Sequence, residues 1–267
     1  MPAQSTISNR ANTDARHGWY VYGVVDGDVE LQEDARGVGD PPAPVELVRS
    51  GSGDVAALVS EIDLDRPVGR PEDLYAHQVL LDAVAVDAPV LPLRFGAVVG
   101  SRDAVVSELL DENEREFASA LRELDCELQY VVRARYREDA VLREVLRDNP
   151  TAASLREKVR AEPAEVAGDL QLRLGEIINN EIEARRSQDT QRLADLLSPV
   201  TVESSVRPPT NELDAAHLAV LVKTDRTADL EEILHGVAQE WSDRATVRLL
   251  GPMAPYDFVV AADEPRS

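Results

Sequence analysis

The stretch LLGPMAPYDFVV, residues 249–260, combines two apolar runs with a restricted hinge between them. The runs, Thr246–Leu250 and Tyr256–Ala261, have the β-branched and aromatic content typical of strands. The hinge holds the residues that restrict or free the backbone most: Gly251, Pro252 and Pro255. Proline also favours extended backbone in the preceding residue, so we expect a defined turn that brings Tyr256 and Phe258 to one face. Such a hinge suggests an assembly protein more than an active site.

Upstream of the hinge, the apolar patterns predict the order strand, helix, strand, strand, helix, strand: 126–136, 138–197, 200–206, 217–223, 227–243 and 246–250. This is the split βαβ, or ferredoxin-like, order with a lengthened first helical crossover. Breaks are expected within the crossover at Asn149-Pro150 and Pro163. Its last helix, 164–197, would be about 50 Å long at 1.5 Å per residue. We therefore expect part of it to project, or a break near 185–191.

The first half of the chain also mixes strands and helices. Strands are predicted at 19–25, 45–48 and 55–62, and a further short buried strand within PVLPLRFG, residues 89–96. A helix is expected to open near Pro71 with one apolar stripe: Leu74, His77, Leu81 and Val84. Ser101 is a candidate N-cap for the next helix, whose expected stripe is Val106, Leu109, Phe117, Leu121 and Leu124. The predicted fold class is therefore α+β with two domains.

The domain boundaries follow from this order of elements. We expect a disordered tail at 1–17, an N-terminal α+β domain at 18–125, and a C-terminal domain at 126–267. The second domain is expected to be a modified ferredoxin-like fold with long helices at about 138–197 and a C-terminal extension.

Charge and composition limit the function. The chain has 28 basic and 50 acidic residues, which gives a formal net charge of −22 at pH 7. Such a surface repels phosphate backbones, so nucleic acid is not an expected partner. No apolar run approaches the roughly 20 residues needed to span a membrane, and the first residues lack the apolar middle of a signal peptide. We expect a cytoplasmic protein.

Motifs for catalysis or cofactor binding are absent from the sequence. The four histidines, at positions 17, 77, 217 and 235, form no HxxxH or HExxH arrangement, and Cys126 is the single cysteine. No GxSxG, GxxxxGK[ST] or GxGxxG sequence occurs. We therefore expect no catalytic residue, no metal site and no cofactor.

Arg94 is a charged residue in an apolar stretch, because it stands between apolar neighbours in LPLRFG. The favoured interpretation is a buried strut paired with a carboxylate or backbone carbonyls, in which case Arg94→Ala lowers stability more than it alters partner choice. The alternative is a partner-facing anchor beside Phe95.

Three segments together resemble the gas vesicle L/F protein family. They are WYVYGVV at 19–25, AHQVLLDAV at 76–84 followed by PVLPLRFG at 89–96, and the closing LLGPMAPYDFV at 249–259. The chain departs from the family pattern in two places. Met253-Ala254 replaces the usual Trp-Pro, and TAASL at 151–155 replaces a Gly-x-x-Tyr-Leu pattern.

The resemblance implies a non-enzymatic accessory protein for gas vesicle assembly, located with the gas vesicle. Its implied partners are the small apolar shell protein and other accessory proteins, toward which it would act as a chaperone-like or nucleating component. The family motif residues are the candidate partner contacts: Arg94, Phe95, Gly251, Pro252, Pro255, Tyr256 and Phe258. A ferredoxin-like enzyme or small-molecule-binding protein remains the alternative. A deep pocket with convergent polar groups would favour it, and a flat or shallow apolar surface would favour assembly.

Overall fold

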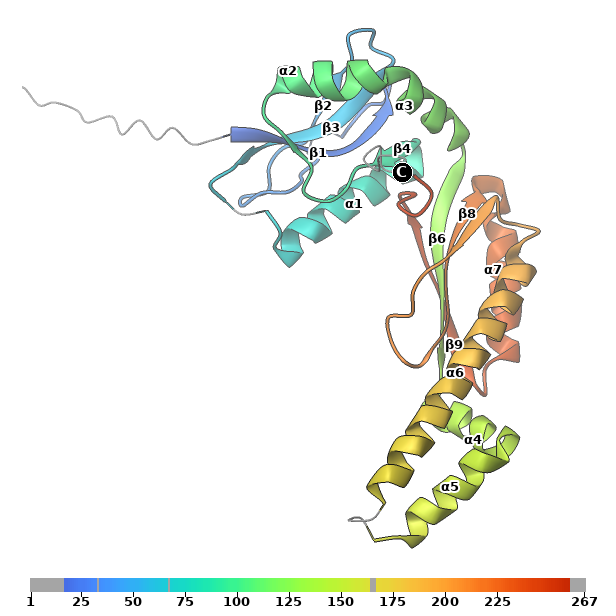
Figure 1. Ribbon diagram of the computed structural model, residues 1–267. Helices are drawn as coiled ribbons and strands as arrows, with labels where there is room; N and C mark the ends of the chain where they lie inside the picture. Colours follow the sequence, from blue (N-terminus) through green and yellow to red (C-terminus); the bar gives the residue numbers. More distant parts are fainter. Residues whose placement is uncertain (1–16, 33, 67, 164–166, 260–267) are drawn as a thin grey trace, which may run out of the picture. The chain divides into compact units, whose positions relative to one another are not determined.

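A computed structural model of the chain describes residues 17–32, 34–66, 68–163 and 167–259 (Figure 1). These residues form two compact units by their internal contacts. The first holds the described residues up to Leu81 together with Pro92–Ser119, and the second holds Asp82–Leu91 and the described residues from Ala120 on. The expected tail, 1–17, lies outside the described residues apart from His17, which begins the first strand.

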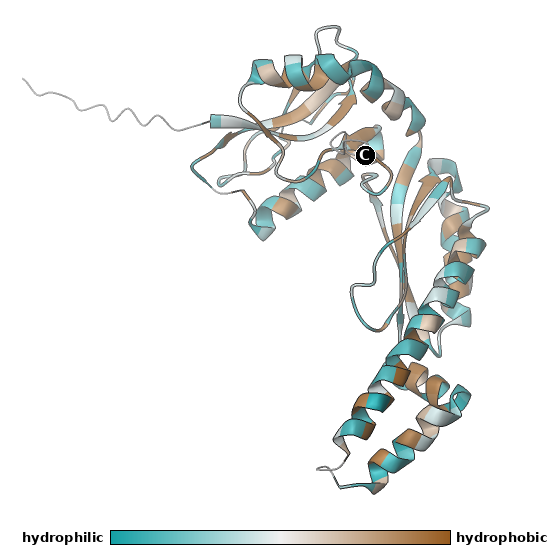
Figure 2. Ribbon diagram, viewed as in Figure 1, coloured by the Kyte–Doolittle hydropathy of each residue, from teal (hydrophilic) through white to brown (hydrophobic). Residues whose placement is uncertain are grey.

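The N-terminal sheet has the order β2-β3-β1-β4, with β5 pairing to β1 as well. Its strands are β1 His17–Asp26, β2 Glu46–Arg49, β3 Val55–Asp63, β4 Val90–Pro92 and β5 Val98–Val99. β1 and β3 pair antiparallel from His17↔Asp63 to Asp26↔Val55. All four strands expected in this half are therefore present. Figure 2 shows hydrophobic residues along the strands of both sheets.

The helices of this half are α1 Pro71–Asp87, α2 Arg102–Ala104, the π-helical segment Val105–Asp111 and α3 Glu112–Glu123. Ser101 is the N-cap of α2, because its hydroxyl accepts a hydrogen bond from Ala104 N at 3.1 Å. The expected stripe of the following helix is shifted at its start: Val105 and Leu110 are buried instead of Val106 and Leu109. A π-helical turn brings residues five apart onto one side, which the 3.6-residue period does not anticipate.

The expected stripe of α1 was wrong at Leu74, whose side chain is 45% exposed. The inward position on that turn belongs to Asp73, which is 2% exposed. Its carboxylate accepts hydrogen bonds from Gly69 N, Arg70 N and Arg66 Nη2 at 3.3, 3.2 and 2.9 Å. These bonds satisfy the backbone at the start of the helix and turn Leu74 outward.

The second unit contains an antiparallel sheet in the order β7-β8-β6-β9. Its strands are β6 Glu127–Tyr136, β7 Glu203–Val206, β8 Asp214–Lys223 and β9 Ala245–Met253. Alternate residues of β6 face opposite sides of the sheet. Tyr136 reaches Asp189 of the long helix, whereas Gln129 reaches Asp257 of the closing segment. The long helix therefore packs on one side of this sheet, and the closing turn at Tyr256–Val259 contacts the other side at Gln129.

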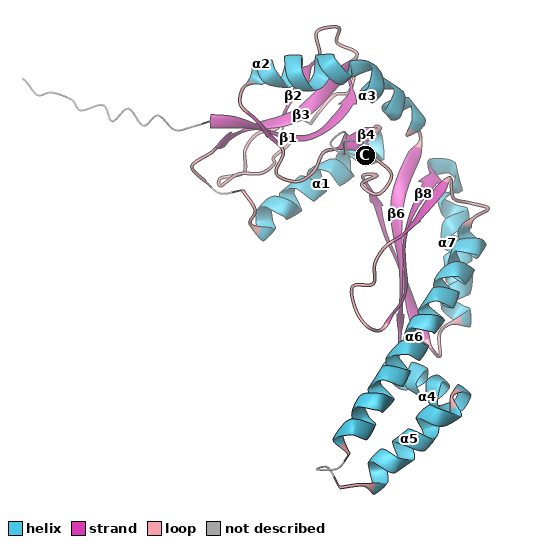
Figure 3. Cartoon of the chain, viewed as in Figure 1, coloured by secondary structure: helices cyan, strands magenta, loops and turns pink. Residues whose placement is uncertain are grey.

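The helices of this unit are α4 Glu138–Asp148, α5 Pro150–Ala161, α6 Gly168–Leu197 and α7 Thr227–Glu240, with a 3₁₀ turn at Thr224–Arg226. The C-terminal half of α6 and α7 lie along one side of the sheet, whereas α4 and α5 pack beside the N-terminal half of α6 (Figure 3). The expected break at Asn149-Pro150 is confirmed, because Asn149 Oδ1 caps α5 by accepting from Thr151 N and Ala152 N, both at 3.0 Å. The alternative of a break at 185–191 was wrong. α6 is continuous there, and its N-terminal half extends past the sheet beside α5 (Figure 1).

The hinge differs from the sequence expectation. β9 does not end at Leu250 but continues to Met253, so Gly251 and Pro252 lie within it. The expected strand at 256–261 was wrong over its described part, since Tyr256–Val259 form a turn. Phe258 N and Val259 N both donate to Pro255 O, at 3.1 and 3.2 Å. Residues 260 and 261 lie outside the described part of the chain.

Candidate functional site

The closing segment begins with a bulge in β9. Gln129 of β6 stands opposite Met253, and Val131 stands opposite Leu250, so β9 has one residue more than β6 over this span. Gly251 lies there with φ +129°, and a Cβ on it would come 2.9 Å from Tyr130 Cδ1 and 3.0 Å from Gln129 O. A bulge of this kind re-aims the chain. Glycine is therefore required by both the backbone angle and the close approach.

Asp257 joins the closing segment to the sheet and to the β7–β8 loop. Its carboxylate accepts from Gln129 Nε2 at 2.6 Å and from Arg207 Nε and Nη2 at 2.8 and 2.7 Å. Gln129 Oε1 accepts in return from Asp257 N at 3.0 Å, and its side chain is fully buried. Two parallel bonds to one guanidinium are the strong form of this ion pair. Sequence reasoning missed Gln129 and Arg207, because their partner lies far along the chain.

Ala254 makes a hydrogen bond that a proline at its position could not make. Ala254 N donates to Asp82 Oδ1 at 2.9 Å, and Ala254 is fully buried. Burial raises the pKa of Asp82, and this bond offsets part of the increase. A proline at this position has no N–H. Alanine at position 254 therefore supplies a donor for Asp82 that proline would lack.

The second family motif folds around an aromatic cluster, defined here as Tyr20, Tyr22, His77 and Phe95. The Phe95 ring centroid lies 6.2 Å from that of Tyr20 and 5.6 Å from that of His77, both edge-on. Tyr20 Oη is 3.0 Å from His77 Nδ1 and accepts from Gly96 N at 3.0 Å. Burial lowers the pKa of His77 to about 4, which keeps the imidazole neutral at pH 7.

Arg94 is the site residue whose favoured interpretation was wrong. It is exposed, and the described residues supply no hydrogen bond or ion pair to its guanidinium. The chain turns directly after β4, with Ala97 N donating to Arg94 O at 3.2 Å. Phe95 takes the inward place in this turn, so Arg94 points away from the core. The partner-facing alternative is the one that this exposure supports.

The two motifs lie in different units, and within each the residues divide between buried and accessible positions. Pro255 is buried, and Phe95, Tyr256 and Phe258 are half-buried. Arg94, Gly251 and Pro252 are exposed. The motif residues therefore serve the fold at several positions and leave part of their surface open.

An apolar surface that sequence reasoning missed lies on the outer side of α1. We call Tyr75, Val79, Ala83 and Val86 the outer row. Their spacings of four, four and three residues place them on one helical face. The three large side chains, Tyr75, Val79 and Val86, are 69%, 49% and 57% exposed. The opposite face of α1 buries His77 and Leu81, so this helix is apolar on two sides. The signal in the sequence was the excess of apolar residues over what one face can hold.

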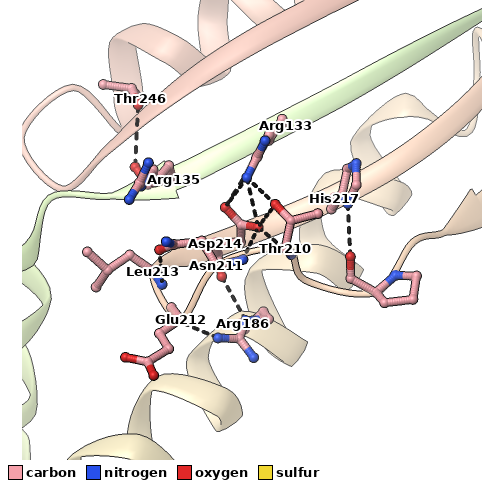
Figure 4. A network of polar contacts seen from close by, with 11 residues as sticks. Arg133, Arg135, Arg186, Thr210, Asn211, Glu212, Leu213, Asp214, His217 and Thr246 are labelled. Carbon is pink, nitrogen blue, oxygen red and sulfur yellow. Dashed lines mark hydrogen bonds and ion pairs between the residues drawn. The ribbon is translucent and has the colours of Figure 1, made fainter. Parts of the chain in front are cut away.

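A polar cleft of about 740 Å³ lies beside the β7–β8 loop and is lined by Arg135, Glu138, Asn179, Glu183, Arg186 and Pro209 to Leu213. Figure 4 shows the polar contacts that hold this loop. Arg186 donates to the backbone carbonyls of Asp214 and Glu212, both at 2.7 Å. The guanidinium is thus engaged in holding the loop.

Asp214 anchors the same loop from within the sheet. Its fully buried carboxylate accepts from Thr210 N and Asn211 N at 2.8 and 3.0 Å and pairs with Arg133 at 3.1 Å. Burial alone would raise the pKa of Asp214, but these donors outweigh it and lower the pKa. Arg186 and Asp214 therefore hold the β7–β8 loop in place beside this cleft.

Comparisons with known proteins were made on sequence and on structure. The family model "Gas vesicle synthesis protein GvpL/GvpF" matches residues 18–260. Gas vesicle protein F of Streptomyces sp. (strain CB03234) is 35% identical over 243 residues, covering 90% of this chain and 98% of that protein. Gas vesicle protein L of the same strain is 30% identical over 277 residues, covering 92% and 94%.

Two crystal structures have the same fold. The gas vesicle protein GvpF from Anabaena sp. PCC7120 superposes with a TM-score of 0.73 at 21% identity, covering 92% of this chain and 99% of that chain. GvpF from Microcystis aeruginosa gives a TM-score of 0.70 at 19% identity, covering 91% and 99%.

Proposed function

Because the chain belongs to the gas vesicle synthesis protein GvpL/GvpF family, we propose that it is a non-enzymatic accessory protein that binds the apolar shell protein. Membership of the family gives it a role related to gas vesicle assembly. The proposal adds that the chain covers shell protein before assembly, as a chaperone-like or nucleating component, together with other accessory proteins. No described helix is long and apolar enough to cross a membrane.

The observation that carries this proposal is the outer row of α1. A protein that must keep water out of a gas space needs an apolar surface, which is an aggregation hazard before assembly. Covering such a surface requires a matching apolar surface on the partner, and the outer row is one. The net charge of −22 gives the resulting complex a repulsive exterior that opposes aggregation.

The alternative of a ferredoxin-like enzyme or ligand-binding protein has less support. It needs a pocket with convergent polar groups, whereas the guanidinium of Arg186 and the carboxylate of Asp214 are occupied by the β7–β8 loop.

For the fold of the second unit, we propose the ferredoxin-like description. Its support is the element order β6, helices α4 to α6, β7, β8, α7, β9 and the sheet order β7-β8-β6-β9. We also retain 18–125 and 126–267 as the proposed domains.

Of the motif residues, Arg94 is the proposed partner contact, with the open edges of Tyr256 and Phe258 as further candidates. An exposed arginine beside an anchored aromatic ring is typical of residues that dominate a protein interface. Phe95, Gly251, Pro252 and Pro255 are proposed to act mainly through the fold.

The proposal is tested in cells that make gas vesicles. Deletion of the gene should abolish or sharply reduce vesicles, and tagged full-length chain should restore them and retain shell protein in a pull-down. Normal vesicles in the deletion strain, together with a pull-down that holds neither shell nor accessory protein, would refute the proposal.

A further inference from the structure

The outer row of α1 has the length and spacing of a helix-binding surface. Tyr75 and Val86 are eleven residues apart, which at 1.5 Å per residue corresponds to about 16 Å along the helix, or three turns. Val79 and Ala83 fill the turns between them, and the half-buried Asp82 lies beside Ala83 on this face, where it accepts a hydrogen bond from Ala254 N. Side chains repeated every three to four residues form a ridge that packs into the groove of a second helix. An extended peptide or a flat sheet does not match this period.

The charged residues of α1 itself are all acidic, and the guanidinium of Arg70, directly before the helix, lies 3.6 Å from the carboxylate of Asp40. α1, Pro71–Asp87, contains no lysine or arginine, and Glu72 and Asp87 are exposed at its two ends. Asp87 stands in the last turn, where the helix dipole makes a negative charge unfavourable. A cation brought by a partner would relieve this repulsion as well as pairing with the carboxylate.

We propose that the outer row of α1 binds an amphipathic helix of the partner, about three turns long at the contact, with lysine or arginine flanking its apolar face. The inference rests on the proposed function, because it assigns a place and a chemistry to the binding of the shell protein. The partner helix lays its apolar residues along Tyr75, Val79 and Val86. Its cations meet Glu72 and Asp87.

A second copy of this chain is a poor occupant for the same surface. Each copy has a net charge of −22, and two copies of α1 would bring exposed carboxylates together. An anionic lipid surface would be repelled in the same way. The occupant is therefore a helix of opposite charge from another protein.

The test uses three fluorescein-labelled peptides of about 14 residues with the full-length chain, followed by fluorescence anisotropy. The first contains leucine and lysine at helical spacing, the second has glutamate in place of lysine, and the third scrambles the first so that no apolar face forms. The binding variant is Tyr75→Ser/Val79→Ser/Val86→Ser. Its matched control is Leu172→Ser/Val202→Ser/Val206→Ser, which removes side chains of 69%, 51% and 66% exposure elsewhere.

The expected result is that the leucine–lysine peptide binds and that the binding variant weakens it at least tenfold. The control variant should change the dissociation constant less than twofold. Both variants keep the net charge, so unspecific attraction of a basic peptide to an acidic protein is the same in each. Equal affinity for the scrambled peptide, or equal loss in both variants, overturns the proposal. Circular dichroism melts establish that both variants fold.

A second pair of variants tests the charges. Glu72→Gln/Asp87→Asn should weaken the peptide severalfold and reduce the salt dependence of binding, whereas Glu231→Gln/Glu232→Gln on the exposed face of α7 should not. Equal effects of the two pairs would contradict the assigned place of the partner's cations.

Shell protein co-expressed with the binding variant separates this inference from the proposed function. If the variant retains as much shell protein as the unaltered chain, the α1 site is wrong and the proposed function stands. If the unaltered chain retains no vesicle protein but still binds the basic peptide through the outer row, the proposed function fails and the helix-binding site stands.

Discussion

Arg94 and Phe95 are neighbours in the chain with opposite surroundings. The Phe95 ring packs edge-on against Tyr20 and His77, while the Arg94 side chain is exposed. A sequence shows that an arginine stands among apolar residues, but the direction of its side chain depends on the turn after β4. The favoured interpretation of a buried strut failed for this reason.

Replacing these two neighbours should therefore have different effects on stability. Arg94→Ala should change the free energy of unfolding by no more than about 0.5 kcal/mol, as for other exposed positions. Phe95→Ala should lower it by about 2 kcal/mol or more, because the ring fills part of the core. Urea denaturation measures both. A loss above about 1 kcal/mol for Arg94→Ala would restore the buried-strut interpretation, for which an unpaired buried partner would be the cause.

His77 should make the first unit less stable in mild acid. Its folded pKa is about 4, below the unfolded value of 6.5, so between these values the unfolded chain binds a proton that the folded chain does not. The free energy of unfolding should therefore fall as the pH is lowered from 6.5 to about 4, by up to about 3 kcal/mol. Denaturation at several pH values measures this slope.

The matched control for this slope is His77→Phe, which keeps a ring but has no titratable group. All other carboxylates and histidines are shared, so the difference between the two pH profiles isolates His77. Parallel profiles over this pH range would show that the imidazole is not buried as neutral.

At the scale of the element, β9 and the closing turn show how the residue at one position changes local bonding. Ala254 N donates to Asp82 Oδ1, and a proline at the same position has no N–H to donate. The bulge at Gly251 lets β9 continue through Pro252, which is tolerated because β9 is an edge strand in the order β7-β8-β6-β9.

A double-mutant cycle tests this bond. Ala254→Pro should destabilise the unaltered chain by about 1 kcal/mol more than it destabilises an Asp82→Ala chain, because only the former is left with a carboxyl that has lost its donor. Thermal or urea unfolding of the four proteins gives the coupling energy. Additive effects within about 0.3 kcal/mol would mean that the bond contributes nothing to stability.

The sequence predicted those elements whose signals are local. The break between α4 and α5 was predictable because Asn149 is a good N-cap and Pro150 fits the first turn of a helix. The π-helical segment was not, since Val105 and Leu110 repeat at a spacing that ordinary helical periodicity does not contain. The outer row of α1 was not predicted, because the buried residues of the same helix already account for a helix with one apolar face. The further apolar residues were therefore not recognised as a second face.

The site residues also divide into those with a local signal in the sequence and those without one. Gly251 and its close approach to β6 could be anticipated from Gly-Pro chemistry, and the two family motifs could be recognised in order along the chain. The partners of Asp257 could not, because Gln129 and Arg207 meet it only after the sheet and its loop have formed. Contacts between residues so far apart in the sequence produce no periodic pattern in it.

At the scale of the whole molecule, a charge of −22 and an apolar row on α1 combine two properties that a carrier of an apolar protein needs. The charge opposes self-association, and the row supplies a contact that becomes favourable when a partner's apolar face is covered. Raising the salt concentration should weaken the charge-dependent part of partner binding and leave the apolar part. A complex that dissociates completely in about 0.5 M salt would contradict an apolar contact.

The most direct test of the central claim is the mass of the complex formed with the shell protein. The two full-length proteins are co-expressed, and the soluble fraction is passed over a size-exclusion column with light-scattering detection. We predict a soluble species of defined mass that contains both proteins, whereas shell protein expressed alone is recovered in the insoluble fraction. Elution of this chain at its own mass, with the shell protein insoluble in its presence, would contradict the claim.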